Sequence, residues 1–205
     1  MCGRFVLITD LSAIARDFIV PNVSVSFSAS RNVCPGDQIL AIVRRGNHNA
    51  IALFQWGLIP GWCMDPSIGA QLINARAETI IEKPSFKNAF ANRRCLIPAD
   101  GFFEWKKEGN KKIPYYFFLK SGKPMVFAGL YERWIAPDRK PVDTCTIITT
   151  AANDLVAPIH DRMPVIVPKE AQSLWLDMTI KDPSKLQDIL KPHPAKEMEC
   201  QPAGL

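Results

Sequence analysis

Hydrophobic and polar residues are arranged along this chain in two patterns, one typical of helices and one typical of strands, and each pattern occupies its own regions. Residues 11–18 place apolar side chains at the i, i+3, i+4 and i+7 spacing of an amphipathic helix, with a capping residue in front. A second helix is predicted over residues 85–94, where Pro84 occupies an allowed first-turn position. Two more helices are predicted late in the chain, over residues 169–178 and 183–190.

The middle of the chain is instead rich in β-branched and aromatic residues, which favour strands. Turn-forming residues at 46–49 and 108–113 each separate two such segments and predict two β-hairpins. Strands are expected at residues 38–45, 50–57, 102–107, 114–120, 124–134, 143–150 and 163–168.

Strands therefore dominate the middle, helices lie at the periphery, and no β-α-β alternation appears. This order predicts an α+β fold, a single domain over residues 1–205 with a curved, barrel-like, mainly antiparallel sheet and peripheral helices. A chain of 205 residues suits one domain and buries enough apolar surface to fold without a metal or a disulfide.

Composition and charge narrow the functional classes only a little. The net charge of +5 is mild, and its basic pairs permit a nucleic-acid partner, although charge alone favours ordinary solvated loops. No apolar run approaches a membrane span and no signal peptide pattern appears, so a cytoplasmic protein with no membrane partner is expected. The six cysteines and three histidines are scattered without zinc spacing, and we expect neither a metal nor another cofactor.

Cys2 is the first residue with distinctive chemistry. It is small enough for a methionine aminopeptidase to remove Met1, and removal would leave a thiol and an α-amine on one carbon. With ordinary pKa values of about 8.5 and about 8, both groups are partly deprotonated at neutral pH. The alternative is that Cys2 is an incidental small residue that helps to bury the N-terminus.

The segment LINARAET, residues 72–79, alternates polar and small side chains. In an extended strand Asn74, Arg76 and Glu78 would share one face, with the alanines between them packed against the core. Asn and Arg together offer donors suited to an anion or an amide. A half-buried polar strand that faces solvent is the alternative.

Two further segments contain candidate acid–base residues. Glu104 lies among three aromatic residues in GFFEW, and burial there would raise its pKa, as a general acid requires. The alternative is a glutamate that points outward from a strand. His160 precedes Asp161 and Arg162 at a predicted helix end, where it suits either a proton shuttle or a surface position beside an ion pair.

Other signals are weaker or missing. Trp56 and Trp62, in proline- and glycine-rich loops, offer either stacking surfaces for bases or caps on the core. The chain has no P-loop, dinucleotide-binding glycine pattern, nucleophile elbow or zinc deaminase signature, which argues against nucleotide cofactors and catalytic metals.

Six segments occur together in the order and spacing of one known family. They are MCGRF, NVCPG, WGLIPGW, INARAET, ADGFFEW and IHDRMP. Together they resemble the SRAP family (SOS response-associated peptidase), with similarity from residue 2 to about residue 178. Each motif alone is weak, but six in register are specific.

The resemblance implies a DNA-damage protein that recognises abasic sites in single-stranded DNA and links to them covalently, as a thiazolidine, once Met1 is removed. It implies crosslinking or lyase-like enzyme activity at abasic sites, with autoproteolytic removal of Met1 as a further activity. We expect a monomer in the cytoplasm that joins the nucleoid when bound to damaged DNA. By the family pattern the catalytic residues are Cys2, Asn74, Glu104 and His160, and the DNA-binding residues are Arg4, Arg76, Arg162 and Trp62.

Two other functions stay open at this point. Cys2 attacking an amide, with a free amine as base, would make the protein an autoprocessing cysteine peptidase or amidohydrolase. A non-covalent reader of modified or single-stranded DNA would use the tryptophans and the basic face. The chain also departs from the family pattern, because Arg31 replaces a common tyrosine, Cys63 replaces a common aromatic residue, and residues 193–205 lack the family's usual terminal element.

Overall fold

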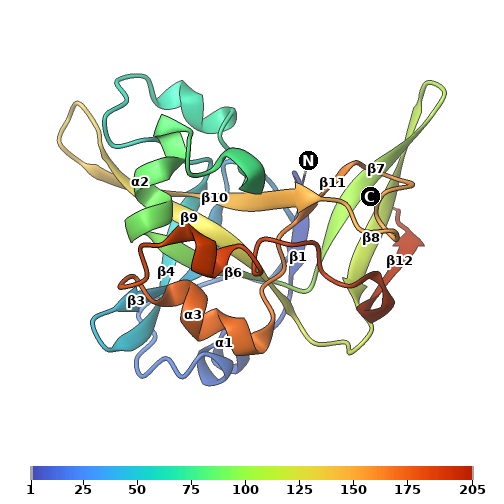
Figure 1. Cartoon of the computed structure of the whole chain (residues 1–205), viewed down its shortest axis with the longest axis horizontal. Helices are drawn as coiled ribbons and strands as arrows, with labels where there is room; N and C mark the ends of the chain where they lie inside the picture. Colours follow the sequence, from blue (N-terminus) through green and yellow to red (C-terminus); the bar gives the residue numbers. More distant parts are fainter. Residues whose placement is uncertain (1, 205) are drawn as a thin grey trace.

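The computed structural model describes residues 2–204, and five of its strands close into a barrel (Figure 1). The barrel strands are β3 (Gln38–Arg45), β4 (His48–Trp56), β6 (Arg94–Ala99), β9 (Met125–Ile135) and β10 (Pro141–Ala151). Around the barrel the order is β10, β4, β3, β6 and β9, after which β9 pairs again with β10. Neighbours are antiparallel except β10 and β4, which run parallel with Thr144 beside Gln55.

Two short strands extend the pairing of β10 beyond the barrel. They are β5 (Asn74–Arg76), which runs parallel to β10, and β11 (Arg162–Pro164), which is antiparallel to it. Thr149 of β10 pairs with Arg76 on one side and with Pro164 on the other. The end of β10 therefore holds two of the sequence motifs side by side.

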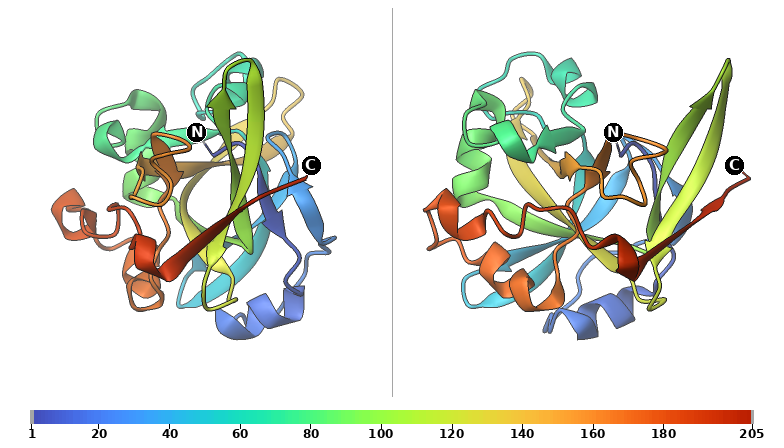
Figure 2. Two further views of the ribbon diagram at one scale, coloured as in Figure 1. Left: turned by 90° about the vertical axis from the view of Figure 1, so that its right-hand side faces the viewer. Right: turned by 45° about the vertical axis from the view of Figure 1, so that its right-hand side comes forward.

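A second, antiparallel sheet packs against the barrel. Its strands, in spatial order, are β12 (Met198–Pro202), β8 (Lys111–Leu119), β7 (Gly101–Glu108), β1 (Phe5–Leu7) and β2 (Ser30–Val33). The β7–β8 hairpin projects away from the barrel, with β12 beside it (Figures 1 and 2). Phe5 joins the two sheets, because its ring lies 5.3 Å from the ring of Trp56 and 5.9 Å from that of Phe127.

The α-helices of residues 2–204 lie at the margin of the fold, as expected (Figure 1). They are α1 (Leu11–Asp17), α2 (Pro84–Asn92) and α3 (Gln172–Leu176). The side chain of Asp10 caps α1 by accepting a hydrogen bond from Ser12 N. In this part of the chain no helix has the length and apolar content needed to cross a membrane.

The α+β class, the barrel-like sheet and both hairpins are confirmed, but two local predictions are wrong. Residues 183–190 form only the 3₁₀ turn η4 (Pro183–Leu186), because a segment this short has little helical stability of its own. Strand β5 ends at Arg76, and the 3₁₀ turn η2 (Ala77–Thr79) follows. That turn buries Ile80 and removes Glu78 from the strand face that it was predicted to share.

Arg94 is a fully buried cation that ties α2 and α3 to the barrel. Its guanidinium donates hydrogen bonds to the backbone carbonyls of Phe90, Trp175 and Asp177. Burial lowers the pKa of Arg94 to about 10, so the group still carries its charge at neutral pH. The carbonyl dipoles, together with the faces of the Phe90 and Trp175 rings, stabilise that charge.

We expect Arg94→Met to lower the free energy of unfolding by roughly 3 kcal/mol, because several buried carbonyls lose their donors at once. Urea unfolding followed by circular dichroism measures the change. Arg16→Met, at an exposed position of α1, is the matched control and should change the free energy by less than about 0.5 kcal/mol. Equal effects in the two variants would contradict the role assigned to Arg94.

Candidate active site

Strand pairing brings Cys2 next to Glu104. β1 and β7 run antiparallel with Phe5 opposite Phe102, and their ladder continues by one more hydrogen bond toward the N-terminus. Extending this register places Gly3 opposite Glu104. Cys2 is the next residue, and the charge of Glu104 acts on its thiol, so the two side chains lie close together. Both residues are buried, with Cys2 at 0% and Glu104 at 2% exposure. The two side chains singled out as nucleophile and acid therefore share one enclosed region.

Glu104 has the environment of a general acid. Burial raises the pKa of its carboxyl group to about 7, and the negative charge of Asp161 acts in the same direction. The alternative that Glu104 points outward from its strand is wrong, because its side chain is 3% exposed. A carboxyl group that is half protonated near neutral pH can donate a proton in one step and accept one in the next.

His160 faces Glu104 from the loop between β10 and β11, with Nε2 4.0 Å from Glu104 Oε2. Its Nδ1 accepts a hydrogen bond from Arg162 N at 3.0 Å, which requires that nitrogen to be unprotonated. Asp161 Oδ1 lies equally close to Nδ1, but this pair gains charge attraction only if the ring is protonated. Because burial lowers the pKa of His160, we assign a neutral ring that turns Nε2–H toward Glu104.

The Cys2 thiol is protonated at neutral pH in this state. Burial raises its pKa far above the usual range, and the charge of Glu104 raises it further. The backbone N–H of Arg4 partly offsets these effects. The thiol is therefore not a preformed thiolate, and its sulfur becomes an effective nucleophile only where a neighbouring group takes its proton.

Asn74 is placed by β5, beside the end of β10. Its Nδ2 donates to Ile73 O at 3.0 Å and to Ile147 O at 3.5 Å, which fixes the orientation of the amide. Its Oδ1 is buried and accepts no hydrogen bond from any residue between 2 and 204. A buried carbonyl oxygen without a donor is costly, so this atom is suited to hold a polar group that arrives from outside these residues.

The predicted DNA-binding arginines occupy different settings. Arg4 lies with its guanidinium carbon 5.2 Å from the centre of the Trp105 ring, close to Cys2 and Glu104 in the β1–β7 ladder. Arg76, two residues after Asn74, is exposed. Arg4 therefore leaves a cation beside the site, and Arg76 leaves one on the surface at the end of β5.

Arg162 is held more firmly. Its guanidinium forms two hydrogen bonds with the carboxylate of Glu78, at 2.7 and 2.9 Å, and a third with Thr149 O at 2.7 Å. The pairing with Glu78 also lowers the pKa of that carboxyl group. Since Arg162 N bonds His160, this cluster fixes the loop that presents the histidine ring.

Trp62 lies in the loop after β4 and is 65% exposed. The next residue, Cys63, accepts a hydrogen bond from Trp134 Nε1, which anchors the loop to the end of β9. Trp134 pairs with Val142 of β10. Val142 lies seven residues along β10 from Thr149, which is bonded to the arginine beside His160, and this separation is roughly 20 Å. The structure therefore does not place Trp62 in the Cys2–Glu104–His160 cluster.

Asp100 has a role that the sequence does not reveal, because an Asp-Gly pair is typical of a turn. Its carboxylate accepts hydrogen bonds from Ile8 N, Thr9 N and Thr9 Oγ1. These bonds fix the far end of β1 and with it the register that leads back to Cys2. Only its place next to Gly101 in the ADGFFEW segment offered a signal, and that signal favours a turn.

Within residues 2–204 no group of three metal-ligating side chains gathers, and the cluster around Cys2 contains acid–base and nucleophilic groups only. The arrangement suits chemistry in which protons move among a thiol, a carboxyl group and an imidazole.

Comparison with known proteins places this geometry in context. A family model described as "SOS response associated peptidase (SRAP)" matches residues 1–204. Abasic site processing protein YoqW of Bacillus subtilis (strain 168) is 46% identical over 203 residues, covering 98% of this chain and 91% of YoqW. Abasic site processing protein YoaM of the same organism is 45% identical over 203 residues, covering 98% of this chain and 89% of YoaM.

The fold also matches solved structures. An X-ray crystal structure of a protein from Bacteroides thetaiotaomicron is similar with a TM-score of 0.91 at 29% identity, covering 98% of this chain and 91% of that chain. A protein from Bordetella bronchiseptica gives a TM-score of 0.83 at 27% identity, with complete coverage of both chains. The barrel and the second sheet are thus shared with these proteins over nearly their whole lengths.

Proposed function

This chain belongs to the SOS response associated peptidase (SRAP) family, and from that membership we propose that it processes abasic sites in DNA by linking to them through Cys2. The substrate is single-stranded DNA that contains an abasic sugar. The protein acts as a monomer in the cytoplasm, at the nucleoid when DNA is damaged. Relatives named abasic site processing proteins, 45–46% identical to this chain, support the substrate class.

The reaction begins once Met1 has been removed and the α-amine of Cys2 is free. An abasic sugar is in equilibrium with an open form that carries an aldehyde. The amine adds to the aldehyde carbon to give a carbinolamine, which loses water to become an imine. The thiol sulfur then bonds to the same carbon and its proton passes to the nitrogen, which closes a five-membered thiazolidine ring.

Closing the ring within one residue explains why the product is favoured. The amine and the thiol belong to the same Cys2, so the second bond forms intramolecularly, and effective molarities in such reactions reach about 10⁵ M or more. The protonated state of the thiol supports this order of events, since the amine attacks first and the thiol follows once its proton has a destination.

Glu104 supplies and takes back protons. With a pKa of about 7, a substantial fraction of this carboxyl group is protonated at neutral pH and can protonate the departing hydroxyl of the carbinolamine. His160, with Nε2–H turned toward Glu104, donates to a sugar oxygen as the ring opens. Asn74 Oδ1, which lacks a donor among residues 2–204, accepts a hydrogen bond from the α-amine and orients it.

One observation carries this proposal: Glu104 is a buried carboxyl group with a pKa of about 7 that lies close to both Cys2 and His160. DNA phosphates would be held by Arg4, which lies beside Trp105, and by the exposed Arg76 at the end of β5. Autoproteolytic removal of Met1 is a second activity that the same carboxyl group, close to Cys2, is suited to assist.

The substrate test compares two oligonucleotides. Protein whose Met1 loss has been verified by mass spectrometry is mixed with single-stranded DNA containing an abasic site, or containing a tetrahydrofuran analogue that cannot open to an aldehyde. We expect a heat-stable adduct, visible as a slower band on a denaturing gel, only with the true abasic site. An adduct of equal yield with both oligonucleotides, or with neither, would rule out the aldehyde chemistry.

A further inference from the structure

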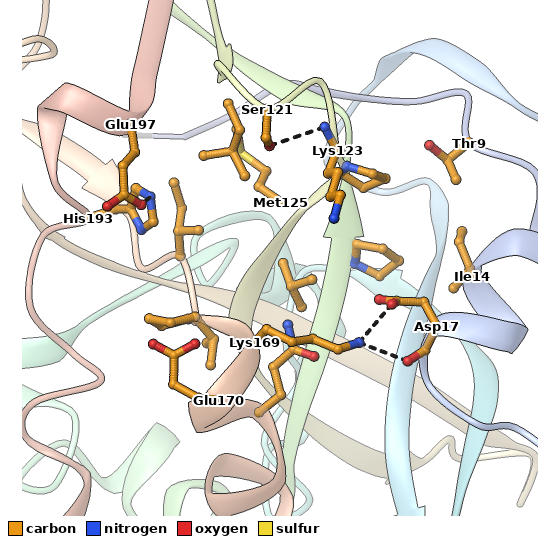
Figure 3. A pocket seen from close by; sticks show the side chains of 18 of the residues that line it. Thr9, Ile14, Asp17, Ser121, Lys123, Met125, Lys169, Glu170, His193 and Glu197 are labelled. Carbon is orange, nitrogen blue, oxygen red and sulfur yellow. Dashed lines mark hydrogen bonds and ion pairs between the residues drawn. The ribbon is translucent and has the colours of Figure 1, made fainter.

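A hollow lies at the opposite end of β1 from Cys2. Its cavity volume is about 770 Å³, within the range typical of small-molecule sites. Thr9 lines it just after β1, and six residues of nearly extended chain separate Thr9 from Cys2, a distance of roughly 20 Å. The walls come from α1, the β8–β9 turn, the segment that follows β11 and the residues before β12 (Figure 3).

Apolar side chains form most of the floor of this cavity. They are Ile14, Phe18, Met125, Val126, Ile166 and Val167. Each belongs to the buried core and is at most 6% exposed, so the floor is a rigid, packed surface. An apolar surface of this kind favours a ligand with a hydrocarbon portion.

Two buried polar side chains interrupt the apolar floor. Gln172 is 8% exposed and lines the cavity. His193 is 9% exposed, and its Nε2 lies 3.1 Å from Glu197 Oε2. These two side chains bring polar atoms into an otherwise apolar floor, where they are suited to contact a polar atom of a ligand.

The rim carries more positive than negative charge. Lys169 is paired with Asp17 at 2.8 Å, and Glu197 lies beside His193. The remaining charged side chains of the rim are Lys120, Lys123, Lys196 and Glu170. The three lysines form no ion pair with any described residue, and Figure 3 shows Lys123 across the cavity from His193. The rim therefore favours an anion.

The backbone of the cavity wall argues against an added peptide strand. Residues Val126 and Ala128 of β9 pair with β6 on one side and bond Val167 N and Val165 O on the other. Val126 O and Ala128 N are therefore already bonded and cannot pair with an added strand, which is how extended peptides usually gain affinity at a sheet.

We propose that this cavity binds a small amphipathic carboxylate, with its hydrocarbon chain on the apolar floor and its carboxylate among Lys120, Lys123 and Lys196. The site is separate from the Cys2 cluster, and its occupation does not depend on abasic-site chemistry. The amide of Gln172 lies within the floor, where it would contact a polar atom of the ligand that is not exposed to solvent.

Octanoate is the probe for this proposal, tested on the full chain by isothermal titration calorimetry and by amide chemical-shift mapping. We expect shifts around Ile14, Met125 and Ile166, and binding more than about tenfold weaker for acetate, which lacks the chain. Octylammonium, which has the chain but the opposite charge, should bind more weakly than octanoate because the lysines repel it.

Variants distinguish specific binding in this cavity from nonspecific binding elsewhere on the surface. Ala13→Phe, which fills the cavity from α1, should abolish octanoate binding, and Lys123→Gln should weaken it by about two- to fivefold. Lys87→Gln, on the exposed face of α2 outside the cavity, is the matched control and should leave binding unchanged. All three variants should keep wild-type crosslinking to abasic DNA, which shows that they are folded.

Three outcomes would overturn the proposal. One is equal binding of octanoate and octylammonium, and another is octanoate binding that Ala13→Phe leaves intact. The third is an acidic peptide that shifts the amides of this cavity while octanoate does not, which would make the site a protein-docking surface instead.

Discussion

A Cys2→Ser variant that has lost Met1 is expected to form no heat-stable adduct with abasic single-stranded DNA. Serine keeps the α-amine and nearly the shape of the side chain, but its hydroxyl closes a weaker ring that reopens on heating. The yield of heat-stable adduct should fall by about 1,000-fold or more, equivalent to more than about 4 kcal/mol. Denaturing gels of heated reactions measure the loss, with Met1 removal confirmed by mass spectrometry for each protein.

Two controls make this result specific to Cys2. Treating the Cys2→Ser reaction with borohydride should restore an adduct, because reduction traps the imine that the amine still forms. Cys34→Ser removes a partly accessible thiol, in the loop before β3, and should crosslink like the wild type. A heat-stable adduct from Cys2→Ser, or loss of the adduct in Cys34→Ser, would show that a different group reacts with the DNA.

The sequence predicted the elements whose pattern is strong and missed those whose pattern is short. The long hairpins were found because alternation over six or more residues is distinctive. β1 has only three residues, all buried, and β6 is buried at all six positions, so neither shows the alternation that marks a strand. β12 is a strand only because it pairs with β8, and this pairing joins segments about 80 residues apart, which a local sequence pattern does not show.

The chemistry of the site was easier to predict than its geometry. Cys2, Glu104 and His160 were singled out by residue type and motif, and the structure brings these three together. The burial of Glu104 was not predictable, because it depends on β1 and on a loop more than 50 residues away that supplies His160. The bonding of Arg162 to Glu78 was missed because it requires the chain to leave β5 after Arg76.

Glu104→Gln is expected to slow crosslinking by roughly 10²- to 10³-fold, within the usual range for loss of a positioned acid–base group. Glutamine keeps the shape and polarity of the side chain but can neither donate nor accept a proton in the reaction. Initial rates of adduct formation with abasic DNA measure the effect. Glu108→Gln, at an exposed position near the end of the same strand, is the matched control and should leave the rate unchanged.

The pH profile tests the assigned role more directly than the rate itself. Wild-type rates should rise with pH as the α-amine, with an ordinary pKa of about 8, loses its proton. They should level off above the Glu104 pKa of about 7, as that group loses the proton that it donates, and fall above about pH 8. In Glu104→Gln the falling limb should disappear, leaving a rate that rises to a plateau. A falling limb that persists in the variant would assign it to another group and remove Glu104 from the proton transfers.

The stability of Glu104→Gln distinguishes slower proton transfer from unfolding. A variant that lost activity because it unfolds would be less stable than the wild type, and the opposite is expected here. Burial raises the pKa of Glu104 from its ordinary range to about 7, so the folded state binds this proton more tightly than the unfolded state does. The favourable contribution is complete below the unfolded pKa of about 4.3 and is lost as pH rises through about 7. At pH 8 the wild type must bury a charge that the neutral glutamine side chain lacks, so Glu104→Gln should unfold at equal or higher urea concentration. A variant that is slower yet no less stable at this pH places the defect in proton transfer.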